Sequence, residues 1–158
     1  MPSAASGRPW LFALLAFAAL LSTCDGPFSL NSASALTPGS RAEVQQQLQG
    51  TWMRETVVDG VQARGVLRLQ PAGAFTESVA VAGADGVVRH FEHAGTWLYD
   101  GTNLKRKYTS MNGRPPSRLN LPFATLQVTF DSRNDFTGVD HIHGHEVHYR
   151  RVADDAQP

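Results

Sequence analysis

The chain has 158 residues, and its 14 basic and 14 acidic side chains give a net charge of zero with histidine neutral. Because a nucleic-acid-binding protein is expected to show a strongly basic face, this balance argues against a nucleic acid as partner. The length fits one domain, which has to be stable by packing alone, since the single cysteine, Cys24, cannot form a disulfide bond within the chain.

Residues 1–23 are typical of an export signal. Arg8 precedes an apolar run from Trp10 to Leu21, which is too short to span a bilayer, because a spanning helix needs about 20 residues. The segment LSTC, which ends at Cys24, resembles the lipobox of bacterial lipoproteins, with Thr23 at a position usually held by Gly, Ala or Ser. The resemblance implies cleavage before Cys24 and acylation of its thiol, which would anchor the protein to a membrane.

Two further features bear on where the protein is located. The small residues Ala33 to Ala35 fit an ordinary secretory signal, which would be cleaved after Ala35 and release the protein to the periplasm. In enterobacterial lipoproteins an aspartate directly after the cysteine is an inner-membrane retention signal, and Asp25 has this position. Residues 24–39 are rich in Ser, Gly, Pro and Ala, which predicts a flexible tether. We expect a lipid-anchored protein on the periplasmic side of the bacterial cell envelope.

The folded domain is predicted to cover residues 40–153, with a short tail at 154–158. It begins with a short helix, because Ser40 and Glu43 have the spacing of a capping box, in which each side chain accepts the other residue's backbone N–H. After this helix the sequence pattern changes to that of β-strands.

Alternation of apolar and polar residues predicts about eight short strands. Segments 61–70 and 124–130 each place their apolar side chains on one face, as a half-buried strand does. Turn pairs such as Asp59-Gly60 recur at hairpin spacing, and no helix of crossover length separates the strands, which excludes a parallel sheet. The expected fold is all-β, an up-and-down antiparallel barrel, because closure removes exposed sheet edges. The basic cluster Lys105 to Lys107 is interpreted as a solvated strand and loop, with contact to anionic lipid headgroups as the alternative.

Two motifs resemble the lipocalin (calycin) pattern across residues 48 to 152. The segment LQGTW leads into the first strand with Gly50 and Trp52, and the segment YRRV lies on the last strand. In that family an arginine from the last strand covers the tryptophan of a Gly-x-Trp motif, and such stacking contributes about 0.5–2 kcal/mol. Trp52 matches the tryptophan, and Arg150 or Arg151 matches the arginine. The chain lacks the TDY element and C-terminal helix of mammalian lipocalins, and it is more similar to the compact lipocalin-like domains of bacterial envelope proteins.

The resemblance implies a small apolar ligand inside the barrel. An eight-stranded barrel has room for packed side chains or for one small ligand. Alternation points five residues toward this interior, and these are the expected ligand-binding residues: Leu67, Leu69, Glu77, Val79 and Leu126. The carboxylate of Glu77 would either orient a ligand or lie in water at the mouth, and we favour the mouth because carboxylates are seldom fully buried.

Four of the six histidines lie in the segment HIHGHEVH. A hairpin with a two-residue turn at His143-Gly144 would pair His141 with Glu146 and project both from the same face as His148. Two imidazoles and a carboxylate could hold Zn or Cu, with water completing the coordination. The alternatives are ordinary polar cross-strand pairs in solvent, which we favour, and a pH-dependent role of the histidines.

Catalysis has the least support in the sequence. It contains no G-x-S-x-G nucleophile elbow and no phosphate-binding glycine loop, and Cys24 lies at the export junction. We therefore expect a binding protein and not an enzyme: an envelope-tethered lipocalin-like barrel for a small hydrophobic or amphipathic molecule. The alternatives are a periplasmic metal-binding module that uses the histidine-rich hairpin, and a filled barrel that docks a protein partner, which the sequence does not identify.

Overall fold

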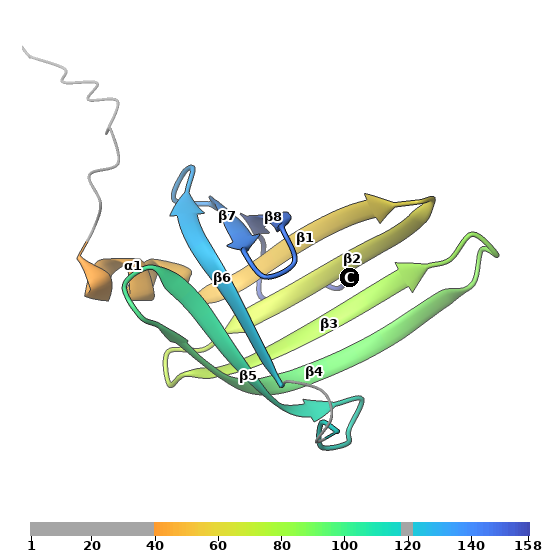
Figure 1. Cartoon of the computed structure of the whole chain (residues 1–158), viewed down its shortest axis with the longest axis horizontal. Helices are drawn as coiled ribbons and strands as arrows, with labels where there is room; N and C mark the ends of the chain where they lie inside the picture. Colours follow the sequence, from red (N-terminus) through yellow and green to blue (C-terminus); the bar gives the residue numbers. More distant parts are fainter. Residues whose placement is uncertain (1–39, 118–121) are drawn as a thin grey trace, which may run out of the picture. The chain divides into compact units, whose positions relative to one another are not determined.

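The computed structural model describes residues 40–117 and 122–158, which belong to one compact unit (Figure 1). The predicted signal peptide, the lipidation site at Cys24, the retention signal at Asp25 and the tether lie outside the described residues. Among the residues that are described, no helix is long and apolar enough to cross a bilayer.

The described part of the chain forms one helix followed by eight strands. Their bounds are α1 (Arg41–Leu48), β1 (Gly50–Val58), β2 (Val61–Leu69), β3 (Ala74–Ala82), β4 (Val88–Tyr99), β5 (Asn103–Met111), β6 (Phe123–Phe130), β7 (Asp135–Asp140) and β8 (His145–Arg151). Each strand pairs antiparallel with the next, and β8 pairs with β1, so the sheet closes into a barrel. The predicted all-β, up-and-down, eight-stranded barrel with a short N-terminal helix is confirmed.

Helix α1 lies at one end of the barrel, which we call the closed end (Figure 1). The predicted capping box is present: the Ser40 N–H donates to Glu43 Oε2 at 2.6 Å, and the Glu43 N–H donates to Ser40 Oγ at 3.3 Å. The helix ends at Leu48, which is fully buried, and the Leu48 carbonyl accepts the indole N–H of Trp52 at 2.7 Å. These contacts join the helix to the first strand.

The hydrophobic core fills the barrel next to α1. It contains the buried side chains Leu48, Trp52, Leu67, Leu69, Phe75, Trp97, Tyr99, Leu104, Leu126, Phe136 and Tyr149. Because the strands run up and down, the β1–β2, β3–β4, β5–β6 and β7–β8 connections all lie at the opposite end, which we call the open end. Large apolar side chains are exposed there, including Val58, Val87 and Ile142, and Ile142 is 82% exposed.

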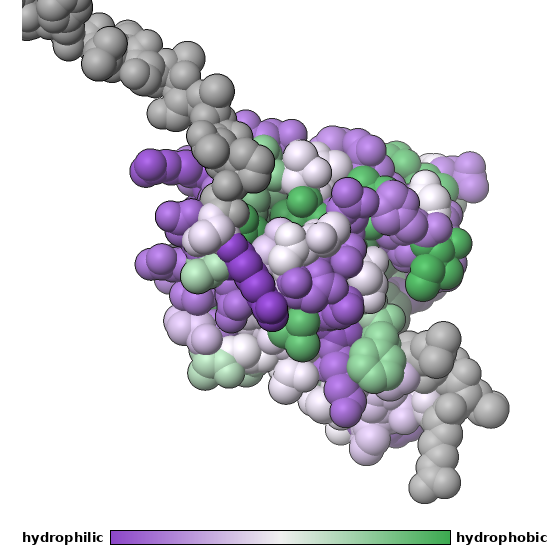
Figure 2. Space-filling model, turned by 60° about the vertical axis from the view of Figure 1, so that its left-hand side comes forward, coloured by the Kyte–Doolittle hydropathy of each residue, from purple (hydrophilic) through white to green (hydrophobic). Residues whose placement is uncertain are grey.

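The outer surface of the barrel is mainly polar. Figure 2 shows hydrophilic residues over most of the face on the side of α1, with separate hydrophobic patches between them. The C-terminal tail lies along the outside of β1 and β2, where Thr51 Oγ1 donates to Asp154 Oδ1 at 2.8 Å and Arg68 donates to the carbonyls of Asp154 and Ala156. The tail is therefore held on the barrel wall.

Strands β1 and β8 pair over a short distance, which we call the seam. Their residue pairs are Trp52 with Arg151 and Met53 with Arg150, whereas β1 and β2 are paired along nine positions. One further backbone hydrogen bond, from the Val152 N–H to the Thr51 carbonyl, extends the seam toward the closed end.

Candidate functional site

The guanidinium of Arg151 covers Trp52 at the seam. Its Cζ lies 4.1 Å from the centre of the indole ring, and its two terminal nitrogens donate to the carbonyls of Gln49 at 2.8 Å and Gln47 at 2.5 Å. Gly50 makes this possible, because a Cβ added at Gly50 would collide with Arg151 Nη1. Arg150 instead lines a cavity on the outside of the seam, so Arg151 is the residue that performs the predicted closure.

A cluster of charged side chains lies inside the barrel, beyond the hydrophobic core. Glu77 of β3 is 3% exposed, and its carboxylate accepts hydrogen bonds from Arg106 Nη1 of β5 at 3.0 Å and Arg54 Nε of β1 at 3.3 Å. We call Arg54, Glu77, His93 and Arg106 the charged floor. The inward direction expected for Glu77 holds, but the expected position in water at the mouth is wrong, because two guanidinium groups compensate the buried charge.

The charged floor keeps Glu77 ionised. Burial alone would raise the pKa of this carboxyl group, but the charge of Arg106, helped by His93 and Arg54, outweighs burial and lowers the pKa to about 2. Burial also acts against the charge of Arg106, and the attraction of Glu77 reverses the effect and raises the pKa of Arg106. Burial raises the pKa of the neighbouring Tyr108 to about 12, so this phenol is neutral at physiological pH.

Two polar atoms of the charged floor are buried and have no hydrogen-bond partner among the described residues: His93 Nδ1 and Arg106 Nε. His93 Nδ1 lies 3.8 Å from Glu77 Oε2, which is beyond hydrogen-bond distance. A buried polar group without a partner costs about 1–3 kcal/mol, so these atoms are unusual in a well-packed interior. Arg106 was interpreted from the sequence as part of a solvated strand, and its burial corrects that interpretation.

A cavity of about 520 Å³ extends from the charged floor to the open end. Its walls near the mouth are apolar and include Met111, Phe123, Ile142 and Val147. The β7–β8 hairpin adds Asp140, His143 and His145 at the rim. The cavity therefore has a charged base and an apolar entrance.

The predicted ligand-binding residues divide into two groups. Glu77 and Leu126 line the interior cavity. Leu67 and Leu69 pack into the core at the closed end, and Val79 is buried without lining this cavity. For these three positions, alternation correctly identified the interior face, but it does not distinguish the filled part of a barrel from the hollow part.

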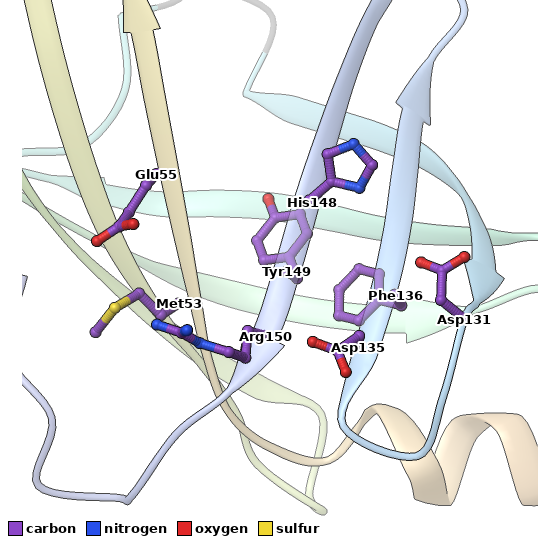
Figure 3. A pocket seen from close by; sticks show the side chains of 8 residues that line it. All are labelled: Met53, Glu55, Asp131, Asp135, Phe136, His148, Tyr149 and Arg150. Carbon is purple, nitrogen blue, oxygen red and sulfur yellow. The ribbon is translucent and has the colours of Figure 1, made fainter.

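A second cavity, of about 310 Å³, lies on the outside of the seam (Figure 3). Figure 3 shows Arg150 of β8 reaching toward Met53 of β1, His148 on the side of β8 away from β1, and Asp131 on the far side of Phe136. It opens beside the residues where β1 and β8 are no longer paired. We regard it as a surface feature of the seam.

The histidine-rich hairpin has a four-residue turn, so the predicted two-residue turn is wrong. Asp140 pairs with His145 and Val139 pairs with Glu146, which leaves residues 141–144 in the turn. Asp140 determines this geometry, because its Oδ1 accepts the backbone N–H of Ile142 at 2.8 Å and its carbonyl accepts the N–H of Gly144 at 2.8 Å.

The longer turn separates His141 from the other two predicted metal ligands, Glu146 and His148. His141 contacts Gln127, whereas His148 lies beside Glu146, with His148 Nε2 at 3.2 Å from Glu146 Oε1, and contacts Thr137 through its Nδ1. Across residues 40–117 and 122–158, no group of three or more His, Cys, Asp or Glu side chains could hold a metal ion. The proposed arrangement of His141, Glu146 and His148 around Zn or Cu is therefore not formed.

Three members of the charged floor were not identified from the sequence. Arg54 lies two residues after Trp52 and Arg106 lies two residues after Leu104, so alternation from a buried neighbour points both inward. His93 lines the interior cavity, whereas His90 of the same strand is exposed. The signal was present, but arginines are usually assigned to the surface.

No protein-family model and no curated protein sequence matches the chain. Among solved structures, the chain is similar to a de novo designed fluorescence-activating β-barrel, with 15% sequence identity and a TM-score of 0.40. The likeness covers 69% of this chain and 97% of the designed chain, and it concerns the fold alone. The fold and the site together define a closed eight-stranded antiparallel β-barrel whose interior holds a hydrophobic core and, beyond it, a charged floor.

Proposed function

We propose that the barrel binds a small amphipathic molecule in the cavity at its open end. The observation that carries this proposal is the interior cavity of about 520 Å³, which joins a charged floor to an apolar entrance. Its volume lies in the range of about 300–1,000 Å³ that is usual for small-molecule sites. A molecule with one polar end and an apolar body matches both parts of the cavity.

The residues that line the cavity favour binding over catalysis. Among the described residues, this lining includes neither serine nor cysteine, which are the common nucleophiles of covalent catalysis. Glu77 is a poor general base, because its pKa of about 2 is far below the operating pH and both its oxygens are held by arginines. We therefore propose a carrier or receptor and not an enzyme.

We further propose that the protein is a lipocalin-like domain attached to the periplasmic side of the cell envelope through Cys24. The stacking of Arg151 on Trp52 beside Gly50 supports the lipocalin-like assignment, because it reproduces the contact that the two sequence motifs imply. The location depends on the export signal and the lipobox alone.

Equilibrium dialysis against the neutral apolar probe N-phenylnaphthylamine tests the site. We expect saturable binding to the wild type and loss of binding in Val147→Trp, because the added indole fills the cavity near its mouth. The matched control is Leu98→Trp, which adds the same indole at an exposed position on β4 and should leave binding unchanged. Equal binding by wild type and Val147→Trp would rule out the interior cavity as the site.

A further inference from the structure

We infer that the charged floor is a binding site for the anionic head group of an amphiphile, with a carboxylate as the fitting chemical class. This inference rests on the proposed function, because it assigns the polar end of the ligand to the base of the same cavity. The ligand would enter with its head group first and leave its apolar body between the walls near the mouth.

The first argument is charge. Arg54 and Arg106 bring two positive charges to the floor, and Glu77 brings one negative charge, so these three side chains leave a surplus of one positive charge. Tyr108 does not change this balance, because its phenol is neutral at physiological pH. A charge in a largely buried place is costly unless it is paired, and a ligand with one negative charge would pair it.

The second argument is the supply of hydrogen-bond donors. Each arginine uses one nitrogen on Glu77, and Arg106 Nε remains without a partner although the residue is only 6% exposed. Among the described residues, Arg54 makes its side-chain hydrogen bond through Nε alone, and its side chain lines the cavity and is 23% exposed. A planar guanidinium presents its N–H groups in a fork that matches the two oxygens of a carboxylate.

The charges at the rim do not compete for this role. Asp140 is the acidic group there, and it already accepts the backbone N–H groups of Ile142 and His143 and lies 2.6 Å from His143 Nδ1. His143 in the turn and His145 at the start of β8 are exposed side chains. The unused donors and the surplus positive charge are therefore at the base of the cavity, and the apolar side chains are nearer its mouth.

Isothermal titration calorimetry with three probes of equal chain length tests the inference: decanoate, decanol and decyltrimethylammonium. We expect decanoate to bind at least about tenfold more tightly than decanol, which corresponds to about 1.4 kcal/mol, and the cationic probe to bind most weakly. Equal affinities for decanoate and decanol would overturn the inference and leave cavity binding intact. Failure of all three probes to bind would instead contradict the proposed function.

Arg54→Gln is the decisive variant, because Arg54 is the more exposed arginine and its loss leaves the Glu77–Arg106 pair in place. We expect its affinity for decanoate to fall at least about tenfold, or about 1.4 kcal/mol, and its affinity for decanol to stay unchanged. The matched control is Arg64→Gln on the outer face of β2, which should bind both probes as the wild type does. An unchanged affinity of Arg54→Gln for decanoate would overturn the inference.

The variant Glu77→Gln should change the affinity for decanoate in the opposite direction. Removal of the competing carboxylate raises the surplus at the floor from one positive charge to two, so we expect tighter binding of decanoate in this variant. Circular dichroism establishes that the variant is folded before the titration. Weaker binding of decanoate by the folded variant would contradict the inference. If Glu77→Gln does not fold, the result for Arg54→Gln decides whether the inference holds.

Discussion

Glu77 is a buried acid that stays charged because arginines from two other strands converge on it. Arg106 and Arg54 bind its two oxygens separately, so both oxygens are satisfied. The three residues come from β1, β3 and β5, and none of these strands pairs directly with another of the three. The charged floor therefore connects parts of the sheet across the barrel interior, where a purely apolar core would fill the space.

The variant Glu77→Gln should lose stability in a pH-dependent way. The pKa of Glu77 is about 2 in the folded protein, against 4.5 for the free side chain, so ionisation of Glu77 favours the fold above about pH 4.5. We expect the variant to be less stable than the wild type near pH 7 by on the order of 3 kcal/mol. The difference should shrink as the pH falls from about 4.5 to about 2, because the wild type then also becomes protonated.

Urea denaturation followed by intrinsic fluorescence at several pH values measures this difference. Thr76→Ala, a change at the next position of β3, is the control and should show the pH dependence of the wild type. A constant difference between wild type and Glu77→Gln across the acidic range would contradict the expected linkage.

Gly50→Ala should weaken the closure of the barrel. The backbone at Gly50 has φ of +119°, and a Cβ there would collide with the arginine that covers Trp52. We expect a loss of about 1–3 kcal/mol from backbone strain, with a further loss from displacement of Arg151.

Thermal unfolding of Gly50→Ala beside Gly60→Ala separates the two contributions. Gly60 also has a positive φ, of +78°, but an added Cβ meets nothing there within 4 Å. We expect Gly60→Ala to be the milder variant, since it introduces only backbone strain. Equal losses in the two variants would show that contact with Arg151 adds nothing.

At the level of elements, the hairpin of β7 and β8 shows why alternation predicts the face on which a side chain lies better than it predicts the length of a turn. The observed register differs from the predicted one by two residues, and an even shift leaves every side chain on its original face. Glu146 and His148 therefore project together as predicted, but His141 moves from the strand into the turn. The length of the turn depends on hydrogen bonds of Asp140 that apolar periodicity does not report.

Asp140→Ala should loosen the β7–β8 turn. The substitution removes the acceptor of the backbone N–H groups of Ile142 and His143, so we expect these amides to exchange with solvent faster than in the wild type. Hydrogen exchange measured by NMR checks this, with His141→Ala as the control, because His141 contacts Gln127 and does not hold the turn. Unchanged exchange at Ile142 would show that backbone hydrogen bonds alone maintain the turn.

Across the whole molecule, the sequence predicts the architecture well and the site only in part. Period-two alternation and regular turn pairs were enough to predict an antiparallel barrel, and the Gly-x-Trp motif located its closure at Trp52. The charged floor was not predicted, because burial of Arg106 depends on Glu77 from a strand that is not its neighbour. Alternation points Arg106 inward, but its contact with Glu77 follows from three-dimensional closure and is not visible in the local pattern.

The lipid anchor at Cys24 is a prediction from the sequence. We expect the protein, expressed in a Gram-negative host, to incorporate labelled palmitate and to enter the detergent phase on Triton X-114 partitioning, because acyl chains bind membranes by their buried methylenes. Cys24→Ala should abolish both properties. Mature protein that begins with Leu36 would instead indicate cleavage by the ordinary secretory route.

The short seam indicates where the barrel opens first when it unfolds. Two residue pairs and one further backbone hydrogen bond hold β1 to β8, against nine pairs between β1 and β2. A closed barrel is expected to open first between the two strands that share the fewest hydrogen bonds. Opening at the seam would turn the barrel into a curved sheet with two free edges. Because unpaired strand edges pair readily between chains, we expect the stacking of Arg151 on Trp52 at the seam to reduce self-association as well.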